Sequence, residues 1–259
     1  MLISIQQLMK RFQLNISGIL HIGAHECEEL SDYEAVGVNR SNTYWVEAMP
    51  NKVSFCRERY GPNLHIYQAV IDERDGENVL FNITNNGQSS SILEFGSHST
   101  SHPQVHVVGK VHATTTRLDT LIEHEHIPIT ELNFINLDIQ GVELRALKSM
   151  EKYLNHIQYI YTEVNTEEVY KGCNLIGEID DYLHGFGFER VAQDIYSQFG
   201  WGDAFYIKKK IFYRSYYIYF FYIYFYLIYY NIKHLFYANS VGRNLSCFYN
   251  PWLRQTKWT

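Results

Sequence analysis

One glycine and an acidic residue 24 positions later have a spacing that could bind a nucleoside. In GILHIGAHECEEL, residues 18 to 30, an apolar run reaches Gly23 and passes directly into an acidic segment of helical pattern. Glu47 lies in the next apolar run, TYWVEAM. In open α/β sheets the ligand lies beyond the end of the first strand, and an acid after the second strand binds the ribose. Either residue alone could be a plain turn glycine or a strand-end carboxylate, but together they predict a nucleoside site.

The first turn also indicates which nucleoside fits. A dinucleotide needs G-x-G-x-x-G, because the second glycine lets the backbone approach a pyrophosphate. Here the turn reads G-A-H-E-C-E, so that Glu26, Glu28 and Glu29 crowd the place of a phosphate. The chain also lacks G-x-x-x-x-G-K-[ST], the phosphate loop of nucleoside triphosphate sites. S-adenosylmethionine carries an amino-acid end and a sulfonium cation in place of phosphates, and it is the cofactor that this turn predicts.

The elements that must position these residues alternate along the chain. From Gly18 onward, short apolar runs alternate with amphipathic stretches, which is typical of a mostly parallel sheet covered by helices. Strand-like runs are expected at 18–23, 43–49, 64–71, 79–84, 132–139, 159–164, 188–195 and 203–209, and helices at 26–37, 51–60, 142–154 and 175–183. The last two runs would pair as an antiparallel hairpin at the sheet edge. The pattern predicts a doubly wound, Rossmann-like α/β fold.

Charge divides the chain into an acidic body and a basic tail. All 28 Asp and Glu lie between Glu26 and Asp203, and residues 1–203 carry 14 basic residues, a formal charge of −14. The remaining residues carry eight Lys or Arg and no acid. We therefore expect an amphipathic helical segment at 1–17, an α/β domain at 18–207 and a tail at 208–259. Since an acidic body offers no electrostatic footprint for nucleic acid, we do not expect a nucleic-acid acceptor.

The tail is rich in aromatic residues. Residues 211–237 hold 15 of the 41 Phe, Tyr and Trp, and the run YYIYFFYIYFYLIYY is shorter than the ~20 residues that span a bilayer. Three hypotheses remain open: a short or surface-lying membrane anchor, a packing element, or an extension without function. The four scattered cysteines form no C-x-x-C pair, which favours a reducing compartment. We expect a cytoplasmic protein, with membrane association through 211–237 as an open hypothesis.

Several motifs in register resemble those of the FkbM-type S-adenosylmethionine-dependent methyltransferases. They are GAHEC at 23–27, EAMP at 47–50, LHIYQAVID at 64–72, TRLDTL at 116–121 and DIQGVE at 138–143. The resemblance spans roughly residues 18 to 207. It departs from the family at His21, Cys27 and Gln140, where the family usually has an acid, a glycine and a glutamate.

The resemblance implies O-methyl transfer to a hydroxyl, often on a sugar or another small molecule. It places the cofactor on Gly23, Ala24, His25, Glu47, Ala69, Val70 and Asp138, with Ala69 and Val70 near the adenine. A hydroxyl acceptor needs a proton acceptor nearby, and Asp138 is the first candidate, with Glu143 and Glu163 as the others. Glu143 could equally be an acid favoured by a helix N-terminus, and Glu163 a helix cap. Gln140 weakens any acid or base role at its own position.

Two further interpretations stay open. His98, His102 and His106 recur every four residues, but Pro103 breaks the helix that would align them. We therefore predict a polar loop that covers the acceptor, and no metal site; the serines at 89–91 could also reach the ligands. The rival to an enzyme is a non-catalytic α/β binding module, tethered to a membrane or a partner by the aromatic tail, which the three departures from the family pattern favour.

Overall fold

Seven strands form the central sheet of the computed structural model, which describes residues 1–209. In order across the sheet they are β3 (His65–Gln68), β2 (Thr43–Glu47), β1 (Ile19–Ile22), β7 (Phe134–Leu137), β8 (Tyr159–Asn165), β10 (Trp201–Lys208) and β9 (Phe188–Tyr196). The chain runs outward from β1 to β3 and then returns to place β7 on the other side of β1. The order thus reverses at β1, where open α/β sheets bind ligands beyond the strand ends.

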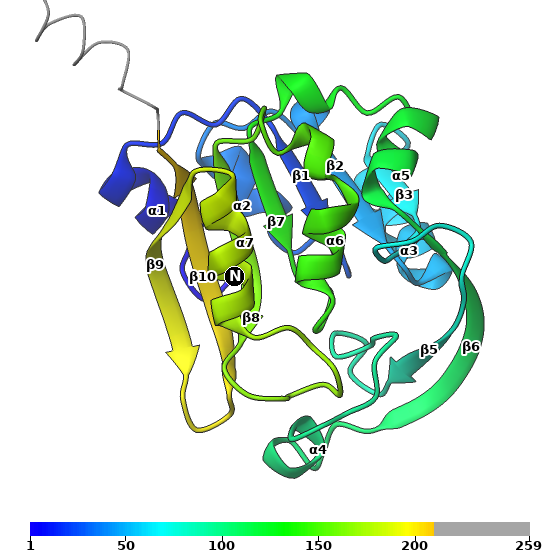
Figure 1. The fold of residues 1–259 in the computed structure, drawn as a ribbon. Helices are drawn as coiled ribbons and strands as arrows, with labels where there is room; N and C mark the ends of the chain where they lie inside the picture. The colour runs from blue at the N-terminus through cyan, green and yellow to red at the C-terminus, as the bar shows by residue number, and fades with distance from the viewer. Residues whose placement is uncertain (210–259) are drawn as a thin grey trace, which may run out of the picture. The chain divides into compact units, whose positions relative to one another are not determined.

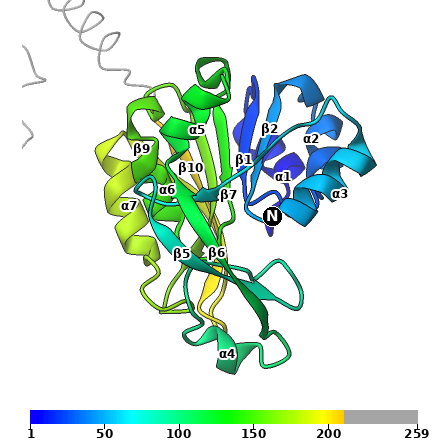
Figure 2. The same ribbon diagram turned by 90° about the vertical axis from the view of Figure 1, so that its right-hand side faces the viewer.

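Helices cover both faces of this sheet because its central strands are apolar on both sides. Every residue of β1, β7 and β8 is buried. Figure 2 shows α1 (Ile5–Phe12), α2 (Leu30–Ala35) and α3 (Pro50–Tyr60) on one face, and α5 (Leu118–His124), α6 (Glu143–Ser149) and α7 (Ile176–Gly185) on the other. Two large apolar clusters fill the two interfaces. The predicted doubly wound fold is confirmed.

The edge of the sheet also follows the prediction. β9 and β10 form an antiparallel hairpin, and β10 inserts between β8 and β9, antiparallel to both. All other pairs in the sheet are parallel. The N-terminal helix is shorter than expected: α1 begins after a capping box at Ser4 and Gln7 and ends at Phe12. Its Ile5 and Leu8 are buried in the cluster on its face of the sheet.

A second, three-stranded sheet differs from the prediction. It consists of β4 (Val70–Ile71), β6 (Val107–Thr116) and β5 (Asn78–Thr84), with β6 in the middle. No strand was expected between residues 84 and 132, where the sequence predicted a polar loop around the histidines, yet β6 begins at Val107. Its residues are mostly exposed, so pairing with β5 forms this strand, without the apolar pattern of a core strand. The predicted run at 64–71 is correspondingly divided: β3 joins the main sheet and β4 pairs with β6.

The hairpin of β5 and β6 reaches past the main sheet, and the short helix α4 (His98–Ser101) lies in its connecting loop (Figure 1). Three 3₁₀ turns complete the regular structure: η1 (Arg40–Asn42), η2 (Ile129–Glu131) and η3 (Glu151–Tyr153). Among residues 1–209, no helix has the length and apolar character needed to cross a membrane. The aromatic run at 211–237 lies outside the described residues.

Candidate active site

A cavity of about 490 Å³ lies where β1, β2, β7 and β8 end. One side is formed by the ends of these strands, and the opposite side by the loop of the β5–β6 hairpin and by residues that follow β8. Of the residues predicted for the site, Gly23, Ala24, His25, Glu47, Ala69, Val70, Asp138 and Glu163 line the cavity. Glu143 does not line it. The structure therefore brings together eight predicted residues that come from five separate segments of the chain.

Gly23, in the first turn, lies in close contact with the residue that follows β7. Its φ of +94° lies in the region that favours glycine, and an added Cβ would lie 1.8 Å from the carbonyl oxygen of Asp138. The backbone N–H groups of Gly23 and Ala24 both donate to the carbonyl of Val46, at 2.9 and 3.0 Å. The first turn is thus packed directly against the ends of β2 and β7, where only glycine fits.

Glu47, the last residue of β2, lines the cavity next to the first turn. It is 5% exposed and accepts hydrogen bonds from the backbone N–H of His25 (2.7 Å) and of Met49 (2.8 Å). Burial raises the pKa of Glu47, while these two bonds act in the opposite direction. Each carboxylate oxygen has a second lone pair that can accept from a ligand hydroxyl. The side chain therefore ties the first turn to the second and can still bind a nucleoside.

The wall beyond Glu47 is apolar. Val70 packs with Met49 and Phe81, and the backbone N–H of Ala69 donates to the carbonyl of Glu47 (3.0 Å). A flat, apolar surface next to an acid suits an adenine ring beside a ribose. The structure places Ala69 and Val70 at this point, next to the predicted ribose site.

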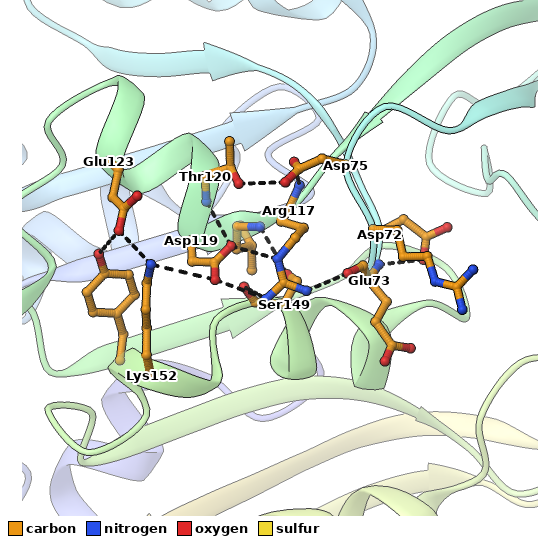
Figure 3. Close-up of polar contacts among 12 residues, drawn as sticks. Asp72, Glu73, Asp75, Arg117, Asp119, Thr120, Glu123, Ser149 and Lys152 are labelled. Carbon is orange, nitrogen blue, oxygen red and sulfur yellow. Dashed lines mark hydrogen bonds and ion pairs between the residues drawn. The ribbon is translucent and has the colours of Figure 1, made fainter.

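Arg117 is the centre of a network of polar contacts with the segment after β4, which Figure 3 shows. Its guanidinium pairs with Asp119 through two bonds of 2.9 Å and also donates to the carbonyls of Glu73 (2.6 Å) and Ser149 (3.0 Å). Asp75 accepts from the backbone N–H of Arg117 (2.7 Å). These bonds join the loop after β4 to the start of α5 and to the end of α6. The TRLDTL motif thus has a structural role outside the cavity, which its sequence alone did not reveal.

Asp138 and Glu163 face each other across one amide group. Nε2 of Gln140 donates to Oδ1 of Asp138 (2.7 Å) and to Oε2 of Glu163 (2.6 Å). Asp138 is exposed towards the cavity, whereas Glu163 is only 6% exposed. Burial, followed by the charge of Asp138, raises the pKa of Glu163 well above its usual range. The pair therefore consists of one exposed carboxyl group and one buried carboxyl group, and burial favours the neutral form of the buried one.

Glu143 serves the backbone of the same loop. It is 2% exposed and accepts from the N–H of Ile139 (3.1 Å) and of Gly141 (3.0 Å). Burial raises its pKa to about 7. Because its oxygens point at these amides and not into the cavity, Glu143 shapes the turn between β7 and α6. This corresponds to the helix N-terminal interpretation considered for this residue from the sequence.

The opposite wall consists mainly of polar and aromatic side chains from the hairpin loop, from the segment after β8 and from the start of β10. Its members are Asn86, Gln88, Ser89, Ser90, Ser91, His98, His102, Gln104, Tyr170 and Trp201. Sequence reasoning had indicated the serines and the histidine loop. It missed Tyr170 and Trp201, which no motif marks. It also missed Asp203, a cavity residue whose only signal was an acid at the start of the apolar run DAFYIKK.

The loop histidines pack with aromatic rings. His98 is 6% exposed and stacks on Phe95, with ring centroids 4.2 Å apart. Burial, followed by the charge of His102, lowers the pKa of His98 to about 4. Nε1 of Trp201 donates to Nε2 of His102 over 3.4 Å. Within residues 1–209, no group of three or more His, Cys, Asp or Glu is arranged to hold a metal ion.

The charge of the lining is strongly acidic. Six carboxyl groups line the cavity, those of Glu28, Glu29, Glu47, Asp138, Glu163 and Asp203. Among the described residues no Lys or Arg lines it. Phosphate groups are bound by Lys, Arg and backbone N–H groups, so this lining suits a cation or a neutral, hydroxylated ligand better than a nucleotide.

Comparisons with known proteins identify related sequences. The family model described as the methyltransferase FkbM domain matches residues 21–190. The 2-O-methyltransferase NoeI of Sinorhizobium fredii is 26% identical over 162 residues, which cover 60% of this chain and 65% of NoeI. The chain thus spans just under two thirds of this curated relative.

Solved methyltransferase structures also align with the chain. Magnesium protoporphyrin IX methyltransferase from Synechocystis PCC 6803, with bound S-adenosylmethionine, has a TM-score of 0.43 and 8% identity, covering 79% of this chain and 76% of that one. TrmK of M. capricolum, in complex with S-adenosyl-homocysteine, has a TM-score of 0.42 and 10% identity, covering 74% and 62%.

Proposed function

Because the chain belongs to the FkbM methyltransferase family, whose members use S-adenosylmethionine, we propose that it methylates a hydroxyl group of a sugar or another small molecule. The observation that carries the proposal is the meeting of Gly23, Glu47 and Asp138 in one cavity. Gly23 and Glu47 form a wall suited to a nucleoside, and Asp138 lies where that wall meets the polar loop of the hairpin.

The cofactor would lie along the strand ends. Its amino-acid end would contact the first turn, at Gly23, Ala24 and His25. Glu47 would accept hydrogen bonds from the ribose hydroxyls, and Ala69 with Val70 would cover the adenine. Two observations support this placement: each oxygen of Glu47 can accept one more hydrogen bond, and the surface around Val70 is apolar. S-adenosylmethionine supplies an activated methyl carbon, so the protein mainly has to provide proximity, worth up to ~7–11 kcal/mol.

Asp138 is the proposed base. It is the accessible carboxylate of its pair and lies between the cofactor wall and the hairpin wall. It would orient the acceptor hydroxyl and take its proton during methyl transfer, a role typically worth ~10²–10⁴-fold in rate. Glu163 is buried, and burial raises its pKa, which makes it less suited than Asp138 to meet the acceptor hydroxyl. The carboxyl group of Glu143 accepts hydrogen bonds from the backbone N–H groups of Ile139 and Gly141 and does not line the cavity.

The hairpin wall supports a hydroxylated acceptor. Its serine, asparagine and glutamine side chains can donate to and accept from hydroxyls, and its Tyr170 and Trp201 rings offer apolar faces. Sugars present hydroxyl groups around a ring with apolar C–H faces, so this combination fits them. The name of the relative NoeI, a 2-O-methyltransferase, is in line with an oxygen acceptor.

A turnover assay with methyl-labelled S-adenosylmethionine over a panel of hydroxylated sugars tests the proposal. We expect label on at least one sugar and none on an RNA oligonucleotide. Calorimetry should show cofactor binding in the absence of an acceptor. Binding without transfer to any acceptor would instead support the binding module, and absence of binding would reject both the cofactor site and the enzyme.

A further inference from the structure

We propose that Gln140 is a positioning residue that holds the carboxyl group of Asp138 directed into the cavity through an amide group that it shares with Glu163. This inference rests on the proposed function, in which Asp138 is the base. It gives a role to a residue that departs from the family pattern, where a glutamate is usual. By comparison with that pattern, Gln140 lacks an acid or base group. Its contacts show that the amide instead donates hydrogen bonds to two carboxyl groups.

The contacts of Gln140 use its whole amide group. One N–H is directed at Asp138 and the other at Glu163, at 2.7 and 2.6 Å. Its Oε1 accepts from the hydroxyl of Tyr170. Because a hydroxyl donor faces one end of the amide and two carboxyl oxygens face the other, the orientation of the amide is determined. A glutamate could not donate to either carboxyl group.

The backbone places this side chain rigidly. Gln140 has a φ of +57°, and its carbonyl accepts from Oγ of Ser91 (2.8 Å). Gly141, next in the chain, donates its N–H to Glu143 (3.0 Å). Hydrogen bonds from the hairpin loop and from the start of α6 therefore fix the backbone on both sides of the amide. A conformation this strained persists only where its surroundings determine it.

The surroundings of the carboxyl pair contain little compensating positive charge. The titratable groups around Asp138 and Glu163 are the carboxyls of Glu143 and Asp203, the Tyr170 hydroxyl, the His21 ring and the amino group of Met1. Burial lowers the pKa of His21. Asp203 and Glu143 already accept from Leu2 and from the turn backbone. The amide of Gln140 is thus the donor that Asp138 and Glu163 share.

Two adjacent carboxylates cannot both ionise without a large cost. Burial favours the neutral form of Glu163, while the amide of Gln140 supplies one donor to an oxygen of each carboxyl group. With a glutamate at position 140, three carboxyl groups would meet without an amide donor between them. At least one more proton would then be bound near neutral pH, and Asp138 would lose its donor. The amide therefore holds the two carboxyl groups in their observed arrangement, and its loss should change how the pair binds protons.

The test compares the wild type with Gln140→Glu and with Gln140→Met, which keeps the length of the side chain but has no donor. Gln158→Glu is the matched control, since Gln158 is exposed and precedes β8 at the far end of the sheet. The acid limb of the kcat/KM profile should move upward by about one to three pH units in both Gln140 variants. Because the carboxyl group of Asp138 would also lose its fixed position, the pH-independent kcat should fall about 10- to 100-fold. Cofactor Kd should change less than about threefold.

A second readout needs no turnover. Infrared difference spectra of protein labelled with ¹³C at the Asp and Glu carboxyls should show one more protonated carboxyl at pH 7 in Gln140→Glu, and a changed titration in Gln140→Met. The control should match the wild type in both readouts. Denaturation curves identify any variant that fails to fold. If one of the two Gln140 variants does not fold, the other one tests the role of Gln140.

The outcomes separate this inference from the proposed function. If the wild type is active and both Gln140 variants keep its pH profile and its carboxyl titration, Gln140 is not a positioning residue. If the wild type methylates no acceptor, the proposed function is rejected. If the spectra of the Gln140 variants are also unchanged, the arrangement in which Asp138 and Glu163 share the amide of Gln140 is rejected as well. Changed spectra in an inactive protein would keep the arrangement and remove only its catalytic use.

Discussion

The two walls of the cavity are built by different means. The strand-end wall depends on backbone geometry: Gly23 has no room for a Cβ, and both oxygens of Glu47 are bonded to main-chain amides. The hairpin wall depends on side chains from a loop between two strands, one of which, β6, is largely exposed. A wall fixed by main-chain contacts tolerates few changes, whereas a loop tolerates many. This difference suits one invariant cofactor and an acceptor that can differ between proteins.

Gly23→Ala should have the largest effect. The new Cβ would meet the carbonyl of Asp138 at 1.8 Å in a strained backbone, so unfolding free energy should fall by about 2–6 kcal/mol. Gly37→Ala, also at positive φ but in open space, should lose only the strain. Gly109→Ala, in the hairpin strand and also in open space, should change stability by less than about 0.5 kcal/mol. Urea denaturation measures all three, and equal losses at Gly23 and Gly109 would contradict the comparison.

Asp138→Asn tests the point where the walls meet. The change keeps the size of the side chain but removes the base, so turnover should fall by ~10²–10⁴-fold. Cofactor Kd should change less than about tenfold, or 1.4 kcal/mol. Steady-state kinetics and calorimetry on the same preparation separate these effects. Equal losses in turnover and cofactor binding would show that Asp138 is a binding residue of the strand-end wall.

Glu47→Ala addresses the strand-end wall alone. It removes the proposed ribose acceptor and should weaken cofactor binding by ~1.5–3 kcal/mol, the range for hydrogen bonds to a charged group. Since His25 and Met49 also lose an acceptor, the melting temperature serves as a control for local damage. Calorimetry that shows unchanged cofactor affinity would remove Glu47 from the site.

His102→Ala should have the smallest effect and should be confined to the acceptor. Losing this ring and its contact with Trp201 should raise the acceptor KM about 2- to 12-fold, as expected for one neutral hydrogen bond. The cofactor Kd should stay within about twofold. His156→Ala, an exposed histidine between η3 and β8, is the matched control and should change neither value. A loss of cofactor affinity in the His102 variant would mean that the two walls are not separate in function.

The strand-end wall could be predicted from the sequence because its signals are local. Continuous apolar runs indicated the central strands, and Gly23 and Glu47 follow two of them at a telling spacing. The hairpin wall could not be predicted in the same way. β6 carries no apolar alternation, since its stability comes from pairing with β5. Trp201 is placed by the pairing of β10 with β8, and Tyr170 by its bridge to Phe95; both are contacts between distant segments.

Gln140 shows a different limit of sequence reasoning. Its departure from the family's glutamate was visible, but the meaning of the amide depends on what its two ends face. The sequence did not indicate that Asp138, Glu163 and Tyr170 converge on it. A residue type can thus be identified as unusual from motifs alone, while its role requires the positions of its neighbours.

The six carboxyl groups of the lining bear on the end of the reaction as well as its start. S-adenosylmethionine carries a positive sulfur, and the product that remains after methyl transfer carries a neutral one. An acidic cavity without Lys or Arg among its described lining residues attracts the first more than the second. S-adenosylhomocysteine should therefore dissociate readily, and product inhibition by it should be weak. Added salt screens the attraction between the carboxyl groups and the positive sulfur of S-adenosylmethionine, so product inhibition should become stronger as the salt concentration rises.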